Sequence, residues 1–142
     1  MKNLVFAISA LFISFNSQAS SAVESASGEQ NFACYVTQEN EIPTDRKDVR
    51  YLLHLDSAGG SFLKYQKLTP HGYGRPHGIY GCDNARVQKN DSEAIILECA
   101  NDGEEGSLVM SLPNKTGEIY FWAEKMGYGE RTLLQVQCEE VE

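Results

Sequence analysis

Basic residues are scarce in this chain of 142 residues, which has 12 Lys and Arg against 20 Asp and Glu and a formal net charge of −8. Such a surface repels the phosphates of nucleic acids and the headgroups of anionic membranes, so we expect neither as a partner. A basic protein would instead be attracted to it. The acidity has a plainer explanation as well, because net negative charge keeps an exported protein soluble.

Sequence signatures of catalysis are absent. The chain contains no G-x-S-x-G, no H-E-x-x-H and no phosphate-binding G-x-x-x-x-G-K-[ST] motif. It also contains no C-x-x-C pair, so zinc ribbons and thioredoxin-like redox chemistry have no support. We therefore expect a protein that is not an enzyme, and we assign it no catalytic residue, no cofactor and no metal.

Long apolar runs are absent beyond the N-terminus. The run Leu4–Phe15 is too short to cross a bilayer. It follows Lys2 and precedes the small residues Ser17 and Ala19, which is the pattern of a secretory signal peptide cut after Ala19. The alternative is a buried N-terminal strand or helix. The signal pattern predicts an exported protein, periplasmic or extracellular, without membrane insertion.

The remainder of the chain reads as a single domain. Residues 20–31 are rich in Ser, Ala, Glu and Gly, with almost nothing to bury, which predicts a flexible leader. Residues 32–142 are of ordinary length for one hydrophobic core. The predicted organisation is a signal peptide over 1–19, the leader, and one β-domain over 32–142.

The domain has the sequence pattern of an all-β fold. Runs of about eight residues rich in β-branched and aromatic side chains alternate with turn signals, and no segment has the periodicity of an amphipathic helix. Short links make neighbouring strands antiparallel. We predict an eight-stranded antiparallel up-and-down meander, closed as a barrel or folded as a flattened sandwich. The predicted strands are 32–37, 49–56, 61–68, 79–89, 92–100, 107–112, 118–125 and 131–138.

The four cysteines all follow the signal peptide and predict two disulfides in an oxidising compartment. A two-residue turn at Asn90-Asp91 would place Cys82 directly opposite Cys99, with the Cα atoms about 4.5 Å apart, as a disulfide requires. Cys34 then pairs with Cys138 and joins the first strand to the last. The other two pairings need a geometry that this strand order does not provide.

Successive turns of a meander fall at alternate ends. At one end the predicted links are short, and at the other they are longer and carry aromatic, His and charged residues, as the binding end of a β scaffold usually does. The stretch Thr69–Cys82, T-P-H-G-Y-G-R-P-H-G-I-Y-G-C, dominates that end. The longer links are 38–48, 69–78, 101–106 and 127–130. The predicted binding residues are His71, Tyr73, Arg75, His77, Tyr80, Asp102, Glu104, Glu105, Tyr128, Glu130 and Arg131.

Two of these residues allow a sharper hypothesis. His71 and His77 could form a zinc-type site with Asp102 or Glu104. Their H-x5-H spacing is not a recognised ligand pattern, so two surface histidines are the plainer interpretation. The glycines and tyrosines of the same loops have a structural alternative too, since glycine satisfies turn dihedrals and tyrosine can cover the end of a barrel.

The edges of the domain carry a resemblance to a known family. Phe32-Ala33-Cys34-Tyr35, Ile119–Lys125 and Cys138 resemble the membrane-bound and periplasmic inhibitors of C-type lysozyme. The resemblance implies a small exported β-barrel with a disulfide between its first and last strands. The Ser-Gly-x-x-Tyr inhibitory loop of that family is absent here.

Three functions follow as hypotheses. The first is an exported, non-catalytic binding protein that presents its loop-rich end to a protein partner, for example as an inhibitor of a basic secreted hydrolase such as lysozyme. The second is a carrier that holds a small ligand in the barrel interior. The third is a small enzyme or metal site at the His71/His77 end. An apolar cavity would favour the second, and imidazoles converging on a carboxylate would favour the third.

Overall fold

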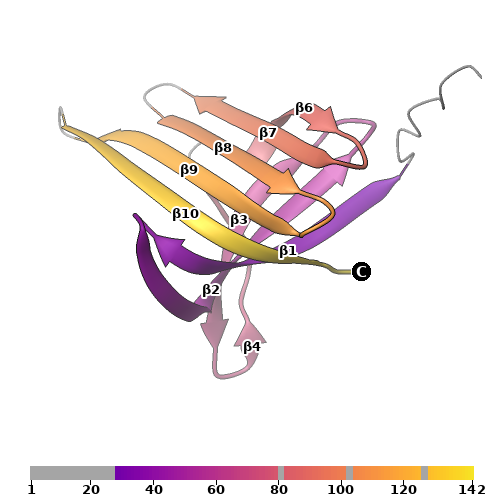
Figure 1. Cartoon of the computed structure of the whole chain (residues 1–142). Coiled ribbons are helices and arrows are strands. Elements are labelled where there is room, and N and C mark those ends of the chain that lie inside the picture. Colours follow the sequence, from indigo (N-terminus) through magenta and orange to yellow (C-terminus); the bar gives the residue numbers. More distant parts are fainter. Residues whose placement is uncertain (1–27, 80–81, 102–103, 126–127) are drawn as a thin grey trace, which may run out of the picture.

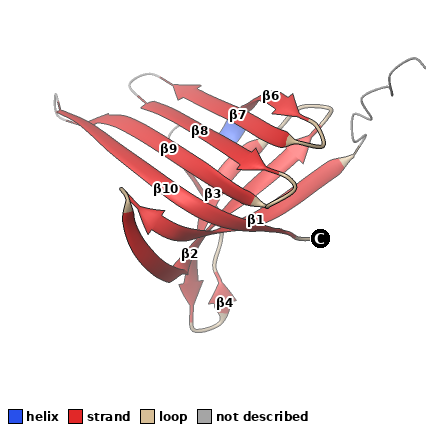
Figure 2. Ribbon diagram, in the orientation of Figure 1, coloured by secondary structure: helices blue, strands red, loops and turns tan. Residues whose placement is uncertain are grey.

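The computed structural model describes residues 28–79, 82–101, 104–125 and 128–142. They form an all-β structure with ten strands and one short 3₁₀ helix (Figure 2). In chain order the elements are β1 (Glu29–Glu39), β2 (Ile42–Asp56), β3 (Phe62–Thr69), β4 (Gly72–Tyr73), β5 (His77–Gly78), η1 (Cys82–Asn84), β6 (Arg86–Asn90), β7 (Ala94–Asn101), β8 (Glu104–Ser111), β9 (Thr116–Lys125) and β10 (Tyr128–Glu140). The first strand thus begins inside the predicted leader.

The strands form one antiparallel sheet in the order β4-β3-β2-β1-β10-β9-β8-β7-β6, with β5 paired to β3 (Figure 1). The first and last long strands are neighbours at its centre, as predicted. The predicted all-β antiparallel fold is confirmed, but the prediction of eight strands, closed as a barrel or folded as a flattened sandwich, differs from the structure in detail. The sheet has ten strands and is not closed, and β4 and β6 lie at the two ends of its strand order. The sheet curls strongly, and its two halves share one core of inward side chains.

The gap between β3 and β6 is bridged by a 3₁₀ turn. The predicted strand over 79–89 was wrong over Cys82–Asn84, which form η1. The amide of Cys82 donates to the carbonyl of Ile79 over 2.7 Å. The amide of Ala85 then donates to the carbonyl of the buried Ser61 over 2.7 Å, across the gap. In the described part of the chain, this turn, its hydrogen bond to Ser61 and an ion pair between Lys64 on β3 and Asp83 in η1 lie where a ladder would have closed a barrel.

The two disulfides join Cys34 to Cys138 and Cys82 to Cys99, which are the predicted pairs. Cys34 lies directly opposite Cys138 in the β1–β10 ladder. Cys82, however, lies in η1 rather than on a strand facing β7. The assumed turn at Asn90-Asp91 was also wrong, because Asn90 itself pairs with Ile95 in the β6–β7 ladder.

Space for the second disulfide depends on a glycine. A Cβ atom at Gly106, the partner of Cys99 on β8, would lie 3.0 Å from the Cys82 sulfur and 3.3 Å from the ring of Phe121. The bridge and the aromatic ring therefore pack against bare backbone, and this position has no room for a larger residue.

The predicted charged link over 38–48 is a β-hairpin. β1 and β2 continue to the turn Asn40-Glu41, whose φ angles of 47° and 68° are the left-handed values that a two-residue type I′ turn needs. The turn is also held to β10, because the amide of Leu133 donates to the Asn40 side-chain oxygen over 2.9 Å. Two shifts of register between β1 and β2 bend this arm of the hairpin.

The two disulfides should differ in their contribution to stability. They close loops with sequence separations of 104 and 17 residues. In the chain-entropy model, a loop of the first size is worth about 4.7 kcal/mol and one of the second about 3 kcal/mol. We expect the variant C34A/C138A to lose more unfolding free energy than C82A/C99A in urea denaturation. An equal or larger loss in C82A/C99A would contradict the ranking.

Candidate functional site

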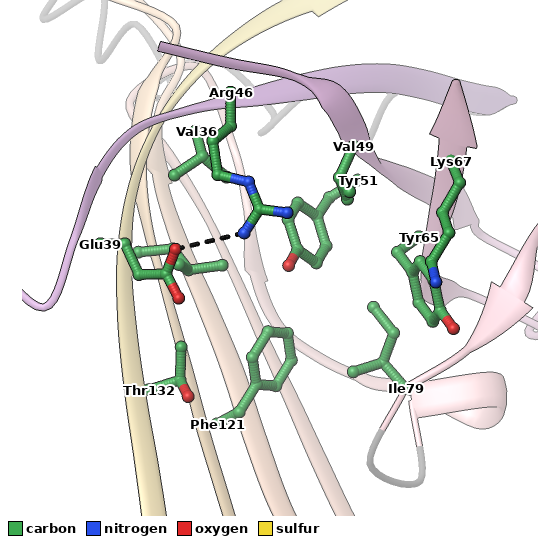
Figure 3. A pocket seen from close by; sticks show the side chains of 11 residues that line it. Val36, Glu39, Arg46, Val49, Tyr51, Tyr65, Lys67, Ile79, Phe121 and Thr132 are labelled. Carbon is green, nitrogen blue, oxygen red and sulfur yellow. Dashed lines mark hydrogen bonds and ion pairs between the residues drawn. The ribbon is translucent and has the colours of Figure 1, made fainter. Parts of the chain in front are cut away.

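A cavity of about 310 Å³ lies inside the curled sheet, next to the β1–β2 hairpin. Its walls come from the inward faces of β1, β2, β3, β9 and β10 and from the segment after β5. The lining residues are Val36, Glu39, Arg46, Val49, Tyr51, Tyr65, Lys67, Ile79, Phe121, Thr132 and Leu134. Figure 3 shows Glu39 and Arg46 on one side of this space and Tyr65 and Lys67 on the other.

The walls of the cavity are mainly apolar and aromatic. The rings of Tyr51 and Phe121 lie 6.0 Å apart, tilted by 32°. Tyr65 stacks against His77 at 5.3 Å, so the β5 segment covers one wall. Val36 and Leu134 belong to the buried core and form the floor. These side chains offer an apolar or aromatic molecule extensive surface in a concave space.

Charged side chains mark the mouth of the cavity. The Arg46 guanidinium donates from Nε and Nη2 to the two carboxylate oxygens of Asp48, at 3.2 and 3.0 Å. It also donates from Nη1 to Glu39 across the hairpin, at 3.4 Å. Three of its five N–H groups are thereby used, which leaves two to bond a polar group in the cavity. Lys67 forms no ion pair within the part of the chain that the structure describes.

The ion pair between Arg46 and Asp48 shifts the pKa values of both side chains. The hydrogen bond from Arg46 lowers the pKa of the Asp48 carboxyl, and its positive charge acts in the same direction. The hydrogen bond to Asp48 in turn raises the pKa of Arg46. Both groups are therefore charged at neutral pH.

The Thr69–Cys82 stretch is less free than a loop of its composition suggests. Tyr73 lies under the Arg50 guanidinium, whose carbon is 4.0 Å from the ring centroid, and its hydroxyl donates to the Lys47 carbonyl over 2.8 Å. Burial raises the Tyr73 pKa. The Gln66 side chain donates to the Gly74 carbonyl over 2.7 Å. Tyr73 thus fastens the segment to the outer face of β2 and β3.

The other predicted residues of this stretch are exposed. His71 lies on the turn before β4, and Arg75 lies in the link between β4 and β5. His77 is exposed, and its ring stacks on that of Tyr65. Tyr80 lies outside the described residues. No group of three metal-ligating side chains in the described ranges includes His71 or His77. The proposed third ligand Asp102 also lies outside those ranges.

The remaining predicted residues lie on strands. Glu104, Ala123 and Glu130 face one another across β8, β9 and β10, and Glu105, Trp122 and Arg131 form the next row. Tyr128 begins β10, and its side chain lies outside the described part. Figure 1 shows that the curl of the sheet carries the β3–β4 turn away from the ends of β8, β9 and β10. The predicted set is therefore divided between two regions.

The cavity residues were missed for a physical reason. The alternation of Val49, Tyr51, Leu53 and Leu55 marked them correctly as inward, but inward residues are normally read as core. Glu39 and Arg46 were assigned to the charged link predicted over 38–48. Asn40 could have indicated the hairpin turn, because Asn is favoured at turn positions with left-handed backbone angles.

Comparison with known proteins identifies no relative. No family model matches the chain, no curated protein matches it, and no solved structure matches it. The resemblance to lysozyme inhibitors therefore depends on the residues quoted for it alone. Within the described ranges, no helix has the length and apolar character to cross a membrane.

The Arg46–Asp48 pair can be tested by titration. In R46Q the pKa of Asp48 should rise toward the ordinary value of about 3.9, because its guanidinium donor is lost. A carboxyl with a depressed folded pKa stabilises the protein above its unfolded pKa, and that contribution disappears as pH falls through the folded pKa. The R46Q variant should therefore show a smaller loss of stability between neutral and acidic pH.

Carboxyl ¹³C NMR titration measures the pKa values of Asp48 and of a control carboxyl in the same sample. Asp91 is the internal control, because the amides of Ala94 and Glu93 lower its pKa and Arg46 does not touch it. An unchanged Asp48 pKa in R46Q, or an equal change at Asp91, would contradict the assignment.

Proposed function

We propose that this protein is an exported, non-catalytic binding protein that holds a small amphipathic ligand in the cavity beside the β1–β2 hairpin. The observation that carries the proposal is a concave space of about 310 Å³ with aromatic walls and a charged mouth. Its volume is at the small end of the range of about 300–1,000 Å³ for ligand pockets. Two disulfides are compatible with an exported protein.

The lining favours a particular chemistry. Tyr51, Tyr65 and Phe121 would contact an aromatic or aliphatic body. The remaining N–H donors of Arg46 and the ammonium group of Lys67 would bond an acidic group at the mouth. The ligand class that combines both features is a small apolar acid, such as an aromatic carboxylate or sulfonate.

The hypothesis of a protein partner stays as a second proposal. Ile42 follows the hairpin turn and is 68% exposed, and Leu68 at the end of β3 is 49% exposed. Large apolar side chains at such tips are typical anchors for a protein surface. An inhibitor of a basic hydrolase would use these tips together with the acidic surface, and it would not need the cavity.

Filling the cavity should abolish ligand binding. Val49 lines the cavity and is only half-buried, so V49W should place an indole in the space without disrupting the core. The mature wild-type chain should bind the fluorescent anion 1-anilinonaphthalene-8-sulfonate saturably at one site, and V49W should bind it at least tenfold more weakly. V109W is the matched control, because Val109 is 47% exposed on β8, away from the cavity.

Near-UV circular dichroism would show that both variants keep wild-type packing, since the same dye also binds partly unfolded proteins. Equal dye affinity in V49W and wild type, or no saturable binding by wild type, would refute the cavity proposal. Either result would favour the protein-partner hypothesis.

The charge at the mouth makes a separate prediction. K67M should weaken binding of the anionic dye several-fold, while the neutral analogue N-phenyl-1-naphthylamine should bind K67M and wild type equally. K115M is the control, because Lys115 is a half-exposed lysine on the β8–β9 turn that pairs with Glu140. Fluorescence titration with both dyes measures the difference. Equal losses for both dyes would exclude a role for the Lys67 charge.

A further inference from the structure

The outer face of the β1–β2 ladder carries three metal-ligating side chains at its far end from the cavity. Glu29 and Asp56 are direct partners across the two strands, and His54 lies two residues before Asp56 on the same face. One ligand atom from each of the three lies within 4.8 Å of the others. This is the one such group in the described part of the chain. The inward Leu53 and Leu55 alternate with His54, so the group faces away from the core.

The imidazole of His54 is held in one tautomer and one orientation. Its Nδ1 lies 2.7 Å from the side-chain oxygen of Asn31, the residue opposite it on β1. An amide oxygen only accepts, so Nδ1 carries the proton and Nε2 keeps a lone pair for a metal. The ring also stacks on Phe62 at 4.8 Å. A metal-ligating histidine is typically oriented in this way, through its second nitrogen.

The two carboxylates add negative charge to the group. Within the described ranges neither Glu29 nor Asp56 forms an ion pair with Lys or Arg. The Ser57–Gly60 turn orients Asp56, because the Ala58 amide donates to its Oδ1 over 2.9 Å. That bond leaves Oδ2 as an acceptor. Glu29 is exposed and can rotate toward the other two side chains.

We propose that Glu29, His54 and Asp56 bind a divalent transition-metal ion, Zn²⁺ by preference. One imidazole and two carboxylates suit Zn²⁺, whose ligand bonds of about 2.0–2.2 Å put tetrahedral ligand atoms about 3.4 Å apart. Small side-chain rotations would bring the three ligand atoms from their separation of up to 4.8 Å to this distance. Ca²⁺ and Mg²⁺ need six or more oxygen ligands and gain little from an imidazole. The fourth position stays open to solvent.

Calorimetry with the untagged mature chain, after treatment with EDTA, tests the site with Zn²⁺ alone as the probe. We expect one Zn²⁺ per chain, and at least tenfold weaker binding in E29Q and in H54Q. H71Q and E105Q are the matched controls, because His71 and Glu105 are exposed and lie outside the group; both should bind as wild type does. Ca²⁺ should bind much more weakly than Zn²⁺.

H54Q removes contacts of His54 to Asn31 and Phe62, so weaker binding by this variant can also come from local unfolding at this end of the β1–β2 ladder. E29Q changes an exposed side chain and therefore decides the case. An NMR titration gives a second measurement: Zn²⁺ should shift the imidazole ¹⁵N signals of His54 and leave those of His71 and His77 in place. Unchanged affinity in E29Q, or shifts at His71 and His77 instead, would overturn the proposal. The cavity is lined by other residues, so neither outcome affects the proposed function.

Discussion

The junction between β1 and β10 is the constraint on which the rest of the structure depends. There the strands at the two ends of the domain pair in register, and the Cys34–Cys138 bond joins two directly opposed residues of that ladder. Side-chain contacts also join β1–β5 to β6–β10, among them the hydrogen bond that Asn90 on β6 donates to Gln30 on β1 over 3.1 Å. The cavity takes Val36 from one half and Leu134 from the other. The junction therefore brings together residues of the cavity as well as of the core.

The open edge between β3 and β6 explains why the interior is not simply filled. A closed ladder would require strand residues where the chain has Pro76 and the Cys82–Asn84 turn. The chain instead crosses the gap as η1, held to β7 by the Cys82–Cys99 bond and to Ser61 by a backbone hydrogen bond. The sheet can then curl around side chains of unequal size, which leaves space beside Ile79.

Much of the fold was predictable, because its determinants are local. Period-two alternation marks Leu53 and Leu55 as inward, and even cysteine number in an exported chain predicts disulfides. The Cys82–Cys99 pair was predicted from a strand register that the structure does not have. The pair is nevertheless correct, because η1 places Cys82 close to Cys99 on β7. The part of the β1–β2 hairpin next to the Asn40-Glu41 turn was missed, because most of its residues are exposed and do not pack in the core. Its residues, such as Arg46 and Asp48, therefore show the polar composition of a loop.

The candidate sites were harder to predict, because strand register rather than sequence spacing brings their residues together. The two histidines of Thr69–Cys82 stand out in the sequence, yet the described carboxylates do not gather around them. His54 is inconspicuous in the sequence, and only the β1–β2 ladder places it diagonally across from Glu29. The same ladder carries Glu39 and Arg46 at its other end. The β1–β2 ladder therefore carries Glu29, His54 and Asp56 at one end and the cavity residues Glu39 and Arg46 at the other, and its length keeps the two groups apart.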